Sequence, residues 1–179
     1  MLMTKVKRRK IMRRGFTLVE LMVVVVIIGV LSAMAVGRYK QVREKALLAE
    51  AGLWCNRLAK AVETMAAETG EYPAHTPAGY VCYWSNNEVW DLNSGKAGLT
   101  RNDSSKPFND WGGPYMERVP KDPWGKNYAW DSDYWLEDEH KWCAAIVCFG
   151  PNKKGQNVYD DDNIIVILSG IDLPEEYYE

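Results

Sequence analysis

Carboxylate side chains gather in one stretch near the C-terminal end of the sequence. Asp160, Asp161 and Asp162 follow one another inside the segment 150–163, which is rich in Gly and Asn. Three successive carboxylates repel one another unless water or a cation neutralises them. Calcium prefers oxygen ligands from carboxylates, amides and backbone carbonyls, so this segment is a candidate site for a hard cation. The alternative is a solvated acidic turn, and the residue types alone leave both interpretations open.

A single carboxylate, Glu20, lies within an apolar run at the other end of the chain. It is the only charged residue in the 21 positions from Phe16 to Val36. As a helix rising about 1.5 Å per residue, this run spans roughly 31 Å, close to the thickness of a bilayer's hydrocarbon core. An unpaired carboxylate there costs on the order of a few kcal/mol. We expect Glu20 either to reach water at the interface or to pair with a positive charge on a neighbouring subunit.

Basic residues precede the apolar run without any acidic residue between them: Lys5, Lys7, Arg8, Arg9, Lys10, Arg13 and Arg14. This pattern predicts a membrane helix whose N-terminal side stays in the cytoplasm. A secretory signal peptide has a shorter apolar stretch, with its cleavage site after that stretch. Here the only small residue suited to cleavage, Gly15, lies before the run. A cut between Gly15 and Phe16 would leave the apolar helix as the new N-terminus.

The charge of the chain is unevenly distributed. The whole sequence carries 22 Lys and Arg against 24 Asp and Glu, a net charge of −2. Without residues 1–15 it keeps 15 basic residues against 24 acidic ones, a net charge of −9. Recognition of phosphate backbones needs basic residues retained in the folded protein, so we expect no nucleic acid partner. His75 and His140 have no nucleophile motif beside them, so we expect no enzymatic activity and no catalytic residues.

All four cysteines follow the apolar run, where the predicted topology places them outside the cytoplasm: Cys55, Cys82, Cys143 and Cys148. Disulfides persist in such compartments. On one strand, Cys143 and Cys148 would be about 16 Å apart and on opposite faces, whereas a disulfide needs Cα atoms within roughly 7 Å. We therefore expect Cys55 and Cys82 each to pair with one of the strand cysteines, with the connectivity open. A zinc site is the alternative, but no Cys-x-x-Cys spacing supports it.

The helical pattern continues beyond the apolar run, and one helix is expected from about Phe16 to Thr69. Two apolar series keep the spacing of three and four residues that is typical of a helix face. The first comprises Tyr39, Val42, Ala46, Ala49 and Leu53, and the second Leu47, Ala51, Trp54, Leu58, Ala61 and Met65. Gly70 suits the helix end. The first half is expected in lipid or a filament core, and the second half against a globular head.

The remaining residues predict a small β-sheet interrupted by a long insertion. Residues 71–110 have a loop-like composition, and Cys82 is expected to fasten this insertion to the core. The segment Asp122-Pro123-Trp124-Gly125 fits a type I turn. Strand-like runs follow at 128–130, 142–149 and 164–168. The fold class is therefore α+β, with a long N-terminal helix on a small antiparallel sheet.

The run Arg14-Gly15-Phe16-Thr17-Leu18-Val19-Glu20, followed by an unbroken apolar helix, resembles the class III signal of type IV pilins and type II secretion pseudopilins. The resemblance covers residues 13 to about 36. It implies that a prepilin peptidase cuts between Gly15 and Phe16 and that Phe16 becomes N-methylated. It further implies that Glu20 aids the docking of the next subunit and that the fold is pilin-like.

The segment 112–128, with Pro120-Lys121-Asp122-Pro123-Trp124-Gly125 at its centre, resembles the head of the major pseudopilins of type II secretion. The acidic loop resembles their calcium loop. The resemblance implies a calcium ion shared by Asn152, Asp160, Asp161 and Asp162, where Asn152 replaces the more usual acid.

The resemblance divides the chain into four regions: a cleaved leader (1–15), a transmembrane and filament-core helix (16–37), the amphipathic second half of that helix (38–69) and a periplasmic head (70–179). It implies a single-pass inner-membrane subunit that assembles with its own copies into a helical filament, the pseudopilus, which drives export of folded proteins across the outer membrane. Implied partners are the prepilin peptidase, an inner-membrane assembly platform and minor pseudopilins. The alternatives are a type IV pilin for adhesion, motility or DNA uptake and, more remotely, a membrane-anchored ligand-binding module.

Overall fold

The computed structural model describes residues 15–155, 158–172 and 174, without the side chains of residues 35–37. The predicted leader, apart from Gly15, therefore lies outside the described residues. The chain divides into two compact units, Met1–Arg43 and Glu44–Glu179, which are described separately below.

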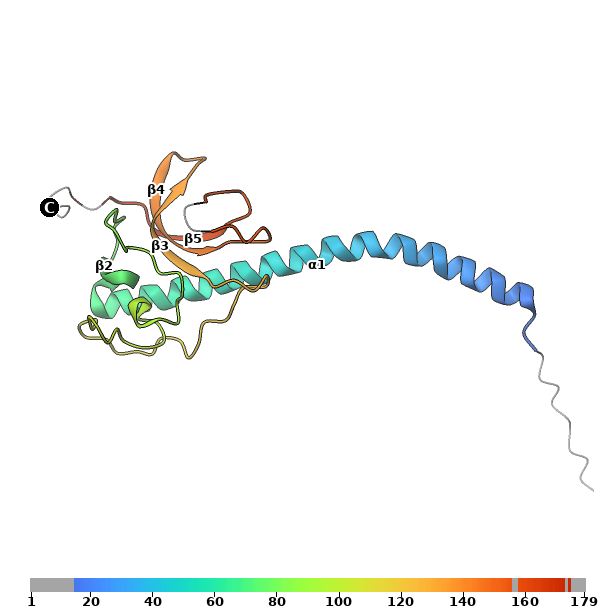
Figure 1. The fold of residues 1–179 in the computed structure, drawn as a ribbon, viewed down its shortest axis with the longest axis horizontal. Coiled ribbons are helices and arrows are strands. Elements are labelled where there is room, and N and C mark those ends of the chain that lie inside the picture. The colour runs from blue at the N-terminus through green and yellow to red at the C-terminus, as the bar shows by residue number, and fades with distance from the viewer. Residues whose placement is uncertain (1–14, 156–157, 173, 175–179) are drawn as a thin grey trace, which may run out of the picture. The chain divides into compact units, whose positions relative to one another are not determined.

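One helix, α1 (Leu18–Thr69), begins in the first unit (Figure 1). It starts two residues later than the sequence predicts, because Thr17 caps it instead of joining it. Every described side chain from Phe16 to Met34 is exposed, and Phe16 itself is 82% exposed. Among the described residues, α1 is the helix that is long and apolar enough to cross a membrane by length and composition.

In the second unit, one face of α1 is buried in the core. The second predicted series supplies much of this face, because Ala51, Leu58, Ala61 and Met65 are all buried. Cys55, Ala59 and Val62 complete it. The first series, by contrast, is exposed along its whole length, including Leu53 at 62%. The prediction of a head-packing face is thus confirmed for one series only.

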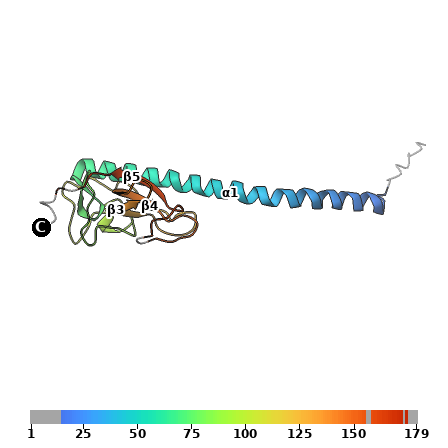
Figure 2. The same cartoon turned by 90° about the horizontal axis from the view of Figure 1, so that it is seen from above.

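Three antiparallel strands form the sheet, in the order β3 (Ala129–Leu136), β4 (Lys141–Cys148) and β5 (Ile164–Ser169). The central strand β4 is buried from Cys143 onward, which explains its continuous apolar sequence. Strand β3 extends six residues beyond the predicted 128–130, through the polar residues Asp131 to Asp133. Figure 2 shows the strands on one side of the last turns of α1.

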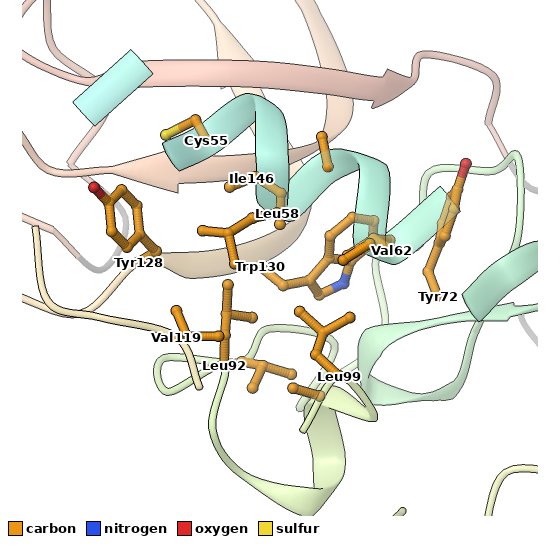
Figure 3. Packing of buried hydrophobic residues seen from close by; sticks show 14 of the residues in the cluster. Cys55, Leu58, Val62, Tyr72, Leu92, Leu99, Val119, Tyr128, Trp130 and Ile146 are labelled. Carbon is orange, nitrogen blue, oxygen red and sulfur yellow. The ribbon is translucent and has the colours of Figure 1, made fainter. Parts of the chain in front are cut away.

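The larger core cluster lies between α1, the sheet and the insertion (Figure 3). Trp130 of β3 lies at its centre with no exposed surface, beside Leu58 and Val62 of α1. A smaller cluster covers the other face of the sheet, where Tyr134 packs edge-on against Tyr159 with ring centroids 4.9 Å apart. The segment between β4 and β5 therefore shields the face of the sheet that α1 does not.

The insertion contains only short elements: β1 (Glu71–Tyr72), η1 (Pro73–His75), β2 (Thr76–Pro77) and η2 (Gly95–Ala97). Hydrogen bonds fasten it to β3. Cys82 N donates to Ser132 O at 3.2 Å, and Ser132 Oγ donates to Cys82 O at 2.7 Å. Cys82 thus joins the insertion to the core as expected, but through its backbone rather than through a disulfide.

The turn predicted at Asp122–Gly125 is present. Gly125 N donates to Asp122 O at 2.9 Å, and Gly125 has a φ of 90°, which favours glycine. The Asp122 carboxylate caps the turn by accepting from Trp124 N and Lys126 N at 3.0 and 2.7 Å. The turn directs the chain into β3.

Candidate assembly helix and acidic loop

Thr17 and Glu20 form a capping box at the start of α1. Thr17 N and Thr17 Oγ1 both donate to Glu20 Oε2 at 2.8 Å, and Glu20 N donates to Thr17 Oγ1 at 3.2 Å. These bonds satisfy backbone donors that a helix start otherwise leaves unpaired. Among the described residues, no hydrogen bond uses the second carboxylate oxygen, Oε1. The spacing Thr-x-x-Glu is a sequence signal for this cap, in addition to the interface or assembly role expected of Glu20.

Two glycines of the first unit, Gly15 and Gly29, are not required by side-chain packing or by backbone conformation within the described residues. A Cβ built at Gly15 or at Gly29 would meet no other atom within 4 Å among the described residues, and neither has a positive φ. Glycine in a helix costs about 1 kcal/mol relative to alanine. Nothing in the described residues therefore requires glycine at these two positions.

The acidic loop brings two of its predicted ligands together. Asn152 Nδ2 donates to Asp160 Oδ2 at 2.9 Å, and Asn152 Oδ1 accepts from Lys154 N at 2.7 Å. Gly150 adopts a φ of 59°, and a Cβ there would overlap the carbonyl oxygen of Asp162. The two ends of the loop are therefore in close contact, which only glycine allows.

Two acceptor oxygens in this loop are buried without a hydrogen-bond partner among the described residues: Asp160 Oδ1 and Asn163 Oδ1. Asn163 Nδ2 donates to Val158 O at 2.8 Å and to Tyr134 Oη at 3.0 Å, which fixes the amide with its oxygen unpaired. Buried acceptors normally have partners, so these two oxygens are candidate ligands for a cation. Asn163 was not predicted, although it directly follows the three aspartates.

The other predicted ligands lie differently. Asp161 is exposed and Asp162 is partly buried. In the part of the chain that the structure describes, no three His, Cys, Asp or Glu side chains come close enough to hold a metal. The oxygen donors of this loop are carboxylates and amides, which suit calcium better than zinc.

All four cysteines are buried and free in the structure, so the expected disulfides are not formed in it. Cys143 belongs to the smaller core cluster and Cys148 to the larger one, which confirms that these two side chains lie on opposite faces of β4. Cys55 shares the larger cluster with Cys148. Burial raises the pKa of the Cys82, Cys143 and Cys148 thiols to about 12, which keeps them protonated and unreactive.

Two family models match separate parts of the chain. Residues 11–36 match the prokaryotic N-terminal methylation motif. Residues 83–165 match protein G of the type II secretion system, and this range includes the Asp122 turn and the acidic loop. No solved structure matches the chain.

The relatives found by sequence include core protein G of the type II secretion system. The Vibrio cholerae protein is 33% identical over 124 residues, which cover 69% of this chain and 73% of the relative. The Escherichia coli protein is 32% identical over 121 residues, covering 65% and 70%. A type IV major pilin of Neisseria gonorrhoeae is 37% identical over 68 residues, covering 38% of this chain and 32% of the relative.

Proposed function

The chain belongs to the family of type II secretion system core protein G, and we propose that it is processed, methylated and assembled as the major subunit of a pseudopilus. It is a structural subunit of the pseudopilin type, and its apolar helix fits anchoring in the inner membrane with the head in the periplasm. In this proposal the filament drives export of folded proteins across the outer membrane.

The main observation in support of this proposal is the exposed apolar surface of the first unit. Described side chains from Phe16 to Met34 are all exposed in the single chain, far more apolar surface than a soluble monomer keeps. Lipid can cover this surface before assembly and equivalent helices of other copies can cover it afterwards. Gly29, which lacks a packing role within the chain, allows close approach of such a neighbour.

Cleavage after Gly15 would place a positive α-amino group on Phe16, four residues before Glu20. Glu20 Oε2 already accepts from Thr17, whereas Oε1 accepts from no described group. We propose that Oε1 receives the Phe16 amino group of the next subunit in the filament. One carboxylate would then both cap its own helix and dock its neighbour.

The acidic loop is proposed to hold a calcium ion. Asp160 and Asn163 supply buried unpaired oxygens, and Asn152 contacts Asp160. Asp161 and Asp162 add negative charge beside them. When bound, calcium would neutralise this charge, so that the loop could cover Tyr134 and the outer face of the sheet. The ion would act on the shape of the head rather than on any reaction.

A type IV pilin for adhesion, motility or DNA uptake is the second candidate. The pilin relatives support it, and two Neisseria gonorrhoeae pilins match 38% and 60% of this chain. The match to protein G extends over residues 83–165 of the head. Because the head distinguishes secretion pseudopilins from pilins, the first candidate is favoured.

Processing and assembly can be tested together. The chain would be produced with a type II secretion peptidase and assembly platform, and its mature mass and filaments examined by mass spectrometry and electron microscopy. We expect a chain that begins at methylated Phe16 and forms filaments, and a Gly15→Val variant that keeps the leader and forms none. Gly52→Ala is the control, because a Cβ there meets no atom within 4 Å. An unprocessed wild-type chain that never polymerises would contradict the proposal.

A further inference from the structure

A second polar site lies in the insertion and shares no lining residue with the acidic loop. A cavity of about 730 Å³ opens between η1, η2 and the coil of residues 101–106. Its lining includes His75, Trp84, Lys96, Arg101, Asp103 and Lys106. Cavities of this size hold small organic ligands. The filament function assigns no role to it.

His75 is a buried side chain with one nitrogen unused. Its side chain is 6% exposed, its ring stacks on Phe108 with centroids 3.9 Å apart, and Nδ1 lies 2.6 Å from Glu71 Oε2. The other nitrogen, Nε2, has no hydrogen-bond partner among the described residues. Asp103 Oδ2 lies 3.8 Å from it, beyond hydrogen-bond distance. The ring is thus held in place with a free polar atom at the cavity.

The carboxylate of Asp103 is also held in one orientation. Its Oδ1 accepts from Ser105 N at 2.8 Å and from Ser105 Oγ at 2.6 Å, which orients the carboxylate. These bonds lower the pKa of Asp103 and keep it charged. Because Nδ1 donates to Glu71, Nε2 is an acceptor. Two neighbouring hydroxyls of a ligand could therefore donate here, one to Asp103 Oδ2 and the other to His75 Nε2. A bare inorganic anion could not, because the Asp103 carboxylate would repel it.

Positive charge surrounds this pair. Arg101 and Lys106 are exposed, and neither forms an ion pair within the described part of the chain. Lys96 also lines the cavity, and its Nζ donates to the carbonyl oxygens of Asn86 and Glu88. The cavity lining therefore contains three cationic side chains and one carboxylate, on a protein that without residues 1–15 has a net charge of −9. Such a lining selects a ligand that carries a carboxylate as well as hydroxyl groups.

The backbone conformation of the cavity wall also favours a role in binding. Ala74, His75 and Asn86 all line the cavity and all have positive φ, at 62°, 59° and 65°. Non-glycine residues in this conformation carry strain that proteins concentrate at binding sites. Trp84, which is partly buried, adds an aromatic face to the same wall.

We propose that this cavity binds an acidic saccharide. The carboxylate of a uronic acid would lie against Arg101 and Lys106. Two neighbouring hydroxyls would donate to His75 Nε2 and Asp103 Oδ2, and the apolar face of the sugar ring would cover Trp84. The carboxylate, the hydroxyl groups and the ring face of the ligand would thus each contact different residues of the cavity wall. The head of this subunit would then bind a glycan as well as its neighbours in the filament.

The full chain in detergent micelles would be titrated with D-glucuronate, D-glucose and inorganic phosphate, and binding followed by saturation-transfer NMR. We expect glucuronate to bind and the other two to bind at least about tenfold more weakly, since each lacks one half of the recognised chemistry. Arg101→Gln/Lys106→Gln should weaken glucuronate binding by about tenfold or more. Both side chains are exposed, so the fold is preserved.

Arg118→Gln/Lys121→Gln removes the same charge from exposed positions outside the cavity and should leave binding unchanged. His75→Gln tests the buried nitrogen and should also weaken glucuronate binding. Equal binding of glucuronate, glucose and phosphate would overturn the proposal. So would glucuronate binding that both double variants reduce equally, since this would reflect net charge alone. Filament formation is a separate readout and need not change in any of these variants.

Discussion

Glu20 Oε2 accepts two hydrogen bonds from Thr17, each 2.8 Å long, at the first turn of α1. The carboxylate that the apolar run isolates is therefore already engaged within its own chain. Any substitution that removes the carboxylate also removes a helix cap. Loss of filaments in Glu20→Ala would then have two physical explanations, a lost cap and a lost docking charge.

Thr17 and Glu20 variants separate these two explanations. Glu20→Gln keeps a side chain that serves in a capping box but removes the charge. Thr17→Val removes the cap, at a cost of about 1 kcal/mol, and keeps the charge. We expect Glu20→Gln to be processed and inserted normally but to form no filaments, as counted by electron microscopy, and Thr17→Val to form them. Filaments from Glu20→Gln but not from Thr17→Val would show that the cap is what assembly needs.

Removal of calcium should destabilise the head. If the ion binds with a hundredfold excess over its dissociation constant, chelation by EDTA removes about 2.7 kcal/mol and lowers the Tm by several degrees. Asp160→Asn should lower the Tm without EDTA and abolish the response to the chelator. Asp110→Asn is the matched control, because Asp110 is an exposed acid of the insertion and not part of the acidic loop. A wild-type Tm that is identical with EDTA and with added calcium would contradict the calcium proposal.

Two leucines on α1 provide a test of the packing in the second unit. Leu58 has no exposed surface, whereas Leu53, five residues earlier, is 62% exposed. Leu58→Ala removes buried methyl groups and should lower the free energy of unfolding by about 2–5 kcal/mol. Leu53→Ala should change it by less than about 0.5 kcal/mol. Urea unfolding of the full chain in detergent measures both, and a large loss in Leu53→Ala would mean that a partner covers that face.

Local patterns predicted much of this fold. The 3.6-residue period located α1 to within two residues at its start, and the apolar runs 142–149 and 164–168 located β4 and β5. The type I turn at Asp122 followed from three residue types at fixed positions. In each case the signal is short in range, because neighbouring side chains alone decide the backbone conformation.

Contacts between distant segments were less visible in the sequence. The series from Tyr39 to Leu53 has the same spacing as the buried one, and only the position of the sheet decides which face is covered. Strand β3 includes Asp131 and Ser132, which are buried although they are polar. The cavity beside His75 depends on residues more than 20 positions apart. The spacing of residues within one helix or strand does not show which distant segments come into contact.

Buried Asp131 should make the stability of the head depend on pH. It is 3% exposed, and burial, together with the charges of Asp133 and Glu88, raises its pKa from 3.8 to about 7. In the unfolded chain the carboxyl loses its proton near pH 4. Between about pH 4 and pH 7 the native state therefore binds more protons than the unfolded state, so the free energy of unfolding falls as the pH rises through this window.

Asp131→Asn removes the charge that burial disfavours. We expect the variant to be more stable than the wild type at pH 8, by about 1–3 kcal/mol, and to lose less stability between pH 5 and pH 8. Urea unfolding at the two pH values measures the difference, with Asp138→Asn as the exposed control that should keep the wild-type slope. Burial also raises the pKa of Asp133, so the free energy of unfolding of this variant should still fall somewhat as the pH rises. An Asp131→Asn variant that is less stable than the wild type at pH 8 would contradict this prediction, because it would mean that the charged carboxylate makes a stabilising native contact.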